Sequence, residues 1–301
     1  MLTIDDFLEK AGGKIQIFNN FKLQANTDLT SKLTICIPDM HLLERGPDDD
    51  FLDGNPQHEE RFLSFLDFLL SVRKTEGDDL EVVQLGDMFD LWQAKWNTNA
   101  IVEAYPEVLG LIADIRPIYV VGNHDIDLIR YYEAQKETFG RKPQHFSIVE
   151  GNMKIIYEHG FQADIANNQD SLTGKIGREI TVIVGWMEHI NPDIDLILSS
   201  DWDAIVKTFE KYNMFTPVRD PQGTIKHEYL NFYINRMDKF NREQNNIDLS
   251  LAVIGHTHKA RLVTLPKDER IFYLMDCGSW VNGGHEIGVI SGKDMAVCQW
   301  E

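Results

Sequence analysis

Short apolar runs alternate with amphipathic stretches along the first half of the chain. The runs at residues 33–37, 81–85 and 118–121 predict buried strands. Apolar residues at helical spacing predict a helix over residues 59–74, and a second helix is expected over residues 98–114. Strands that alternate with helices indicate an α/β fold with a largely parallel sheet, whose sites lie at the carboxyl ends of the strands.

The rest of the chain carries shorter patterns. Residues 3–11 predict a helix with Thr3 as its N-cap, and residues 14–24 predict a hairpin around Asn19 and Asn20. Further strands are expected at residues 153–157, 251–254, 260–265 and 271–275 and in a tail that ends at residue 300. The tail has an antiparallel pattern, so we expect it to form a second sheet packed on the first.

The pattern changes between residues 161 and 248. Residues 202–212 and 227–241 predict amphipathic helices, and Pro217 and Gly223 mark the loop between them. A helical insertion between two strands that form a site is a natural cap over that site. We therefore expect one domain over residues 1–301, with a helical cap insertion at about 161–248.

Composition restricts the class of protein. The chain has 301 residues, of which 43% are apolar, and this is enough for one large domain. We find no apolar run long enough for a transmembrane helix and no signal-peptide pattern at the N-terminus. The odd, scattered Cys36, Cys277 and Cys298 favour reduced thiols in a cytoplasmic protein.

The charge balance is strongly acidic. A net charge of -19 disfavours nucleic acid and anionic membrane surfaces as partners. Part of the excess comes from Asp48, Asp49 and Asp50, which we expect to form a solvated loop.

Polar side chains of a metal-binding type follow the predicted strands where each strand ends. In several of these loops a glycine comes first, and we expect Gly255 to let the chain turn sharply. The candidate ligands are Asp39, His41, Asp87, Asn123, His159, His256 and His258. Such a mixed nitrogen and oxygen set is too large for one tetrahedral zinc ion and suits two ions that share a carboxylate. It favours manganese, iron, zinc, cobalt or nickel over calcium.

Five motifs in order carry a resemblance to a known family. They are Asp-x-His, Gly-Asp-x-x-Asp, Gly-Asn-His-Asp, His-Gly and Gly-His-x-His, and they run from Asp39 to His258. Together they resemble the motifs of the calcineurin-like metallophosphoesterase superfamily. The resemblance implies a four-layer αββα sandwich of two mixed β-sheets and two divalent ions, with manganese the leading candidate. One metal would take Asp39, His41 and His258, the other would take Asn123, His159 and His256, and Asp87 would bridge them.

The resemblance also implies a reaction. A hydroxide that bridges the metals would attack phosphorus in line, in a phosphoester or pyrophosphate bond of a small-molecule or lipid-linked substrate. His124 would assist the leaving group, Asp125 would orient His124, and Asp90 would brace its loop. Arg45 is either a contact for substrate phosphate or a surface residue, and the same alternatives hold for Arg130.

Two alternatives stay open. The strings at residues 87–92 and 159–164 are similar to the branch that contains UDP-2,3-diacylglucosamine hydrolase, a lipid pyrophosphatase, although that branch normally has Arg where this chain has His124. Aromatic residues of the cap would then either grip a lipid or form the cap's own core; they are Tyr229, Phe232, Tyr233 and Phe240. The second alternative is a non-catalytic binding scaffold, which the complete set of candidate ligands disfavours.

Overall fold

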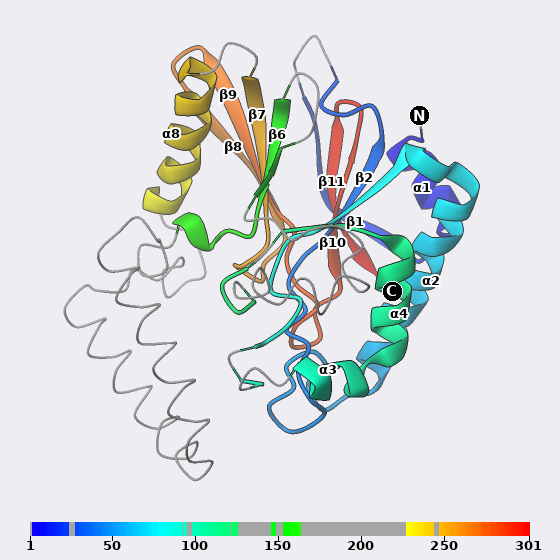
Figure 1. Cartoon of the computed structure of the whole chain (residues 1–301). Coiled ribbons are helices and arrows are strands. Elements are labelled where there is room, and N and C mark those ends of the chain that lie inside the picture. Colours follow the sequence, from blue (N-terminus) through cyan, green and yellow to red (C-terminus); the bar gives the residue numbers. More distant parts are fainter. Residues whose placement is uncertain are drawn as a thin grey trace, which may run out of the picture.

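The computed structural model describes residues 2–23, 28–91, 93–94, 98–120, 122–125, 146–148, 153–163, 227–243 and 247–301. Two mixed β-sheets pack face to face in this part of the chain (Figure 1). The first sheet has the order β1 (Ile15–Lys22), β11 (Asp294–Trp300), β10 (Glu286–Ser291), β2 (Leu33–Ile37), β3 (Leu80–Gln84) and β4 (Ile118–Tyr119). The second has the order β5 (Phe146–Ile148), β6 (Met153–Glu158), β7 (Ile247–Ile254), β9 (Arg270–Asp276) and β8 (Arg261–Lys267).

Each sheet contains a run of parallel strands, at one end of the first sheet and in the middle of the second. Strands β2, β3 and β4 are parallel in the first sheet, and β6, β7 and β9 are parallel in the second. The flanking pairs are antiparallel. The sequence therefore predicted parallel strands correctly, but these strands belong to two sheets rather than to one.

Helices cover both outer faces. The helices α1 (Ile4–Lys10), α2 (Gln57–Glu76) and α4 (Pro106–Ile115) pack on the first sheet, and α8 (His227–Glu243) packs on the second (Figure 1). Short helices occur at α3 (Thr98–Ala104), η1 (Gly77–Asp79) and η2 (Phe161–Ala163). Side chains alternate along β2, so that Ile35 joins the core under the helices and Cys36 joins the core between the sheets. The predicted αββα sandwich is confirmed.

Local predictions failed at two points. Within the predicted hairpin over residues 14–24, Ile15–Lys22 form the single strand β1, which pairs with β11 and has a bulge between Ile17 and Asn19 in place of a hairpin turn at Asn19. The helix expected over 98–114 is two helices, because Pro106 has no backbone N–H and begins α4. The predicted N-cap at Thr3 is confirmed, since its hydroxyl accepts from the Asp6 amide at 3.1 Å.

The C-terminal tail divides between the sheets. Strands β8 and β9 extend the second sheet, whereas β10 and β11 complete the first, with β10 beside β2. The prediction that the whole tail forms the second sheet was therefore wrong. Turn residues predict which neighbouring strands pair, but they do not predict which distant strand a pair joins.

Helix α8 lies in the segment that the sequence assigned to the cap. Tyr229, Tyr233 and Met237 are buried on one face of this helix, in the core that it shares with the second sheet. The helix is thus an outer layer of the sandwich. Of the rest of the predicted cap, residues 161–163 form η2 and residues 247–248 begin β7, whereas residues 164–226 and 244–246 lie outside the described residues. Among the described helices, none is both long and apolar enough to cross a membrane.

Candidate metal centre

The loops at the carboxyl ends of the parallel strands meet at one edge of the sandwich. Hydrogen bonds join the loops after β2 and β3, since the amides of Met40 and His41 both donate to the Asp87 carbonyl at 2.9 Å. The Asp39 carboxylate joins the two sheets, because it accepts from the His256 amide at 2.9 Å. All five ligand-bearing loops predicted from the sequence are described, and backbone contacts hold several of them together.

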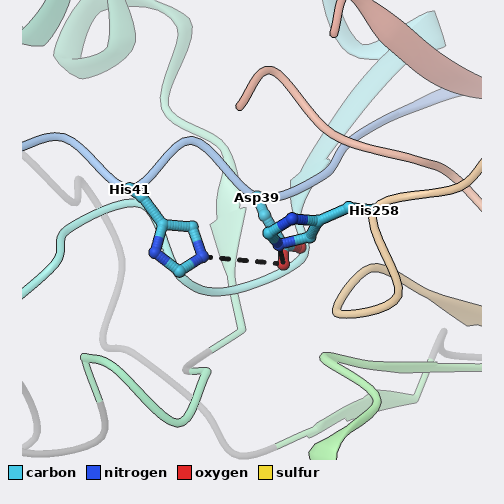
Figure 2. Close-up of side chains that lie close together, drawn as sticks. All are labelled: Asp39, His41 and His258. Carbon is cyan, nitrogen blue, oxygen red and sulfur yellow. Dashed lines mark hydrogen bonds and ion pairs between the residues drawn. The ribbon is translucent and has the colours of Figure 1, made fainter. Parts of the chain in front are cut away.

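Three of the candidate ligands form a group that we call the outer group: Asp39, His41 and His258. Figure 2 shows the His41 and His258 imidazoles beside the Asp39 carboxylate. His258 Nε2 lies 2.9 Å from Asp39 Oδ2, and His41 Nε2 lies 4.0 Å from the same oxygen. The His258 side chain is 35% exposed, so this group reaches the surface.

A second group, which we call the inner group, consists of Asp87, His159 and His256. His159 Nε2 lies 3.0 Å from Asp87 Oδ2, and the His159 side chain is completely buried. The other ring nitrogen, Nδ1, lies 2.9 Å from the Leu85 carbonyl, which fixes the ring orientation. Asn123 precedes His124, whose backbone amide donates to Asp87 Oδ1 at 2.8 Å.

Asp87, a member of the inner group, is also close to the outer group. Its Oδ2 atom lies 3.0 Å from His159 Nε2 and 3.5 Å from His41 Nε2. The position of Asp87 is therefore compatible with the prediction that one carboxylate serves two ligand groups.

Four of the candidate ligands have left-handed backbone conformations. The φ values are 50° for His41, 48° for Asp87, 65° for His256 and 53° for His258. Such values are uncommon for residues with a Cβ atom, and they concentrate where the surrounding structure imposes them for function. The strained backbone points these side chains out of the strand direction and toward one another.

The glycines of these loops allow close approach to the carboxylates. A Cβ atom on Gly122 would lie 2.0 Å from Asp87 Oδ1, and one on Gly255 would lie 2.2 Å from Asp39 Oδ1. A Cβ atom on Gly86 would lie 2.8 Å from His159 Nδ1. We expected Gly255 to be needed for a turn, but its φ is not left-handed. The space beside Asp39 is what requires glycine there.

His124 is held by a different carboxylate from the one that the sequence suggested. Its Nδ1 atom lies 3.0 Å from Asp90 Oδ1, and the other Asp90 oxygen lies 3.6 Å from His41 Nδ1. Asp125 instead accepts hydrogen bonds from the amides of Met88 (3.0 Å) and Gly122 (2.6 Å) and from the hydroxyl of Tyr119. Asp125 thus braces the loops after β3 and β4, and Asp90 orients His124.

The electrostatics show how strongly this site favours positive charge. Burial alone would raise the pKa of the Asp87 carboxyl, but His159 and His124 outweigh it and hold this pKa well below its ordinary range. Burial alone would lower the pKa of His159, but Asp87 and Asp39 raise it to about 10. The clustered carboxylates therefore need cations close by, either protonated imidazoles or metal ions.

Unpaired buried atoms test whether a metal ion fits. His41 Nε2, His159 Nε2 and Asn123 Oδ1 are buried and have no hydrogen-bond partner. His159 Nε2 is close to Asp87 without the geometry of a hydrogen bond. A buried polar atom without a partner costs about 1–3 kcal/mol, which coordination to a metal would offset. Imidazole, carboxylate and amide donors suit a divalent transition metal, so these residues fit one.

Some residues have roles that the sequence did not reveal. Asp276, at the end of β9, is buried and accepts a hydrogen bond from the hydroxyl of Thr257, the residue between His256 and His258. It follows a strand and precedes a Cys-Gly pair, and that signal could have identified it. Asp49 is buried and accepts from the Tyr105 hydroxyl, so the expected solvated loop is partly wrong.

The sequence offered two arginines, Arg45 and Arg130, as candidate contacts for substrate phosphate. Arg45 forms an ion pair with Glu59 at 2.7 Å and donates to the Ala104 carbonyl at 3.1 Å, so its guanidinium is already engaged. Arg130 lies outside the described residues.

Two mixed sheets with clustered Asp and His side chains at the ends of their parallel strands form an α/β fold with a candidate metal centre. The family model for calcineurin-like phosphoesterases matches residues 33–260, and the chain belongs to this family. It is therefore a metal-dependent phosphoesterase. A search of curated proteins gave no match.

Proposed function

We propose that this phosphoesterase uses two divalent metal ions, one held by each ligand group, with Asp87 shared between them. Asp39, His41 and His258 would hold one ion, and Asn123, His159 and His256 would hold the other. The position of Asp87 Oδ2, within 3.5 Å of a histidine from each group, is the observation that supports this proposal most directly.

A bound metal pair supplies Lewis-acid charge for the phosphate oxygens and activates water for attack on phosphorus. The residues of this chain prepare the site around that chemistry. The Asp90 carboxylate fixes the His124 ring through Nδ1, and the His124 amide donates to Asp87. Through Nε2, His124 would then donate a proton to the leaving oxygen of the substrate.

The donor set also supports a proposal for the metal. The candidate ligands combine imidazole nitrogens with carboxylate and amide oxygens and include no thiolate, which favours manganese, with iron, zinc, cobalt and nickel as alternatives. We also propose a cytoplasmic location, which the free and buried Cys36, Cys277 and Cys298 support.

For the substrate, we propose a small-molecule phosphoester. A lipid pyrophosphate was the alternative that aromatic residues of the predicted cap suggested. Tyr229 and Tyr233 are buried between α8 and the second sheet, and Phe232 and Phe240 flank Arg236. These side chains are therefore committed to packing α8, which removes the support that they gave to a lipid substrate.

Metal analysis and turnover test the proposal together. The full-length protein is loaded with Mn²⁺, its metal content is measured, and hydrolysis of bis-p-nitrophenyl phosphate, phosphomonoesters and nucleotide pyrophosphates is followed. We expect about two ions per chain and turnover of at least one substrate class. His124→Ala should retain both ions and lose activity, whereas His58→Gln, a histidine on α2, serves as the matched control.

Two outcomes contradict the proposal. A single ion per chain in the active protein would exclude the shared-carboxylate arrangement. A fully loaded protein that hydrolyses none of these substrates would favour the binding-scaffold alternative.

A further inference from the structure

Helix α8 contacts the residues on both sides of His159. Glu158 ends β6, and His159 and Gly160 follow it. The Tyr229 hydroxyl donates to the Gly160 carbonyl at 3.1 Å. The Arg236 guanidinium pairs with Glu158 Oε1 at 2.5 Å. Both contacts come from the same helix, at positions seven residues apart.

The ion pair between Arg236 and Glu158 is well defined. The Glu158 side chain is completely buried, so its carboxylate depends on the guanidinium for compensation. Arg236 is in turn packed against the rings of Phe232 and Phe240, whose centroids lie 5.5 Å and 5.7 Å away. The position of Arg236 is therefore fixed by its own helix, and through it the position of the end of β6.

The Tyr229 contact reaches the inner group itself. A Cβ atom on Gly160 would lie 2.8 Å from the Cβ atom of His256 and 2.9 Å from the Tyr229 hydroxyl. Gly160 thus separates the helix from His256 by a distance too small for any other side chain. A movement of Tyr229 would be transmitted through Gly160 to both His159 and His256.

The helix is anchored independently of these contacts. Tyr233 and Met237 are fully buried in the core shared with the second sheet. On the other side, Lys267 on β8 pairs with Asp238 at 2.8 Å. A helix held in this way is a rigid reference for the loop after β6.

We propose that α8 is a positioning element for the inner group, and that Tyr229 and Arg236 hold His159 in its ligand geometry. This rests on the proposed function, because it takes His159 as a metal ligand. Neither residue touches the reacting atoms. The two side chains set the affinity of the inner ion and leave the outer ion unaffected.

The test measures metal binding rather than activity. Mn²⁺ is titrated calorimetrically into the metal-free full-length protein, and the absorption spectrum of the Co²⁺-loaded protein is recorded. For Tyr229→Phe and Arg236→Met we expect one dissociation constant to rise about 10–100-fold, with a changed Co²⁺ spectrum, and the other constant to stay unchanged. Lys267→Met removes an anchor of α8 outside the β6 loop and should change neither readout.

A second variant guards against misfolding. Arg236→Met leaves the buried Glu158 carboxylate without its partner, whereas Glu158→Gln combined with Arg236→Met removes both charges. The double variant should also weaken one site only. Unchanged constants in Tyr229→Phe and in the double variant, or equal weakening of both sites, would overturn the proposal.

His159→Ala separates this proposal from the function on which it rests. If His159→Ala still binds two ions, the proposed ligand assignment fails. If it loses one ion while the α8 variants bind normally, the assignment stands and only the positioning role fails.

Discussion

The outer and inner groups contain the same residue types in different surroundings. The outer group ends in His258, whose side chain is 35% exposed, whereas the His159 side chain of the inner group is completely buried. In the inner group, the loop after β3 contacts His159 through the Leu85 carbonyl, and α8 contacts the neighbouring Gly160 through Tyr229, whereas His256 is half-buried. Equal ligand chemistry therefore does not imply equal metal binding, because burial and the surrounding hydrogen bonds govern both affinity and exchange.

The strongest test of this comparison is Asp87, which we propose that the two metal sites share. In Asp87→Ala we expect loss of both ions and a fall in kcat of about 10³-fold or more, because the substitution removes a ligand from each site. Metal content of the purified protein and steady-state kinetics measure this. A variant that retains one ion at wild-type affinity would show that Asp87 belongs to one group only.

Glycine substitutions can disturb one group at a time. Gly255→Ala places a Cβ atom against Asp39 Oδ1 and should weaken the outer ion, whereas Gly86→Ala places one against the Gly122 backbone and His159 Nδ1 and should weaken the inner ion. We expect about 10–100-fold changes in the affected dissociation constant. Calorimetric titration of both variants measures them. Equal effects on both ions in both variants would contradict the separation into groups.

The Asp90 carboxylate lies beside His41 of the outer group and beside His124, so a substitution at Asp90 tests how far this contact supports the outer group. Asp90→Asn should weaken the contacts to His41 and His124, so we expect about tenfold weaker binding of the outer ion and a lower kcat. The inner ion should be unaffected. Asp67→Asn, on the same chain but in α2, is the matched control. An unchanged kcat in Asp90→Asn would contradict the role of Asp90 in orienting His124.

Exposure predicts a difference in exchange rate. We expect a chelator to remove Mn²⁺ in two phases, with the rates about tenfold apart, because His258 of the outer group is 35% exposed, whereas Asp87 and His159 of the inner group are buried and His256 is half-buried. His258→Ala should abolish the fast phase. A single phase in the wild type, or loss of the slow phase in His258→Ala, would reverse the comparison.

The smallest expected effect is at Arg45, outside both groups. Its guanidinium pairs with Glu59 and is about half exposed, so Arg45→Ala should change stability by about 0–1 kcal/mol and leave KM within about twofold. Thermal unfolding and steady-state kinetics check this. A large rise in KM would restore Arg45 as a phosphate contact.

The sequence predicted that the loops carrying the candidate ligands come together, because the signal of each loop is local. A buried strand, a glycine and a polar residue lie within a few positions of one another, as at Gly122 and Asn123. Each parallel strand brings its carboxyl end to the same edge, so nearness in space followed from the strand pattern.

Features that depend on distant partners were harder to predict. Asp90 and Asp125 are both acids close to a ligand in the sequence, and only the packing of the loops decides that Asp90 meets His124. An amphipathic helix such as α8 has the same pattern whether it covers a cap or a sheet. Strand β10 joins β2 across most of the chain, and no local signal specifies that pairing.

That pairing has a consequence for the order in which the protein is made. Strand β2, which leads to Asp39, lies between β3 and β10, and the Asp39 carbonyl accepts from the Trp280 amide at 2.8 Å. During synthesis the segment that carries Asp39 and His41 leaves the ribosome long before residues 280–291 do. The backbone contacts that fix Asp39 therefore form only after residues 280–291 have been made, so we expect the candidate ligand set to assemble late in synthesis.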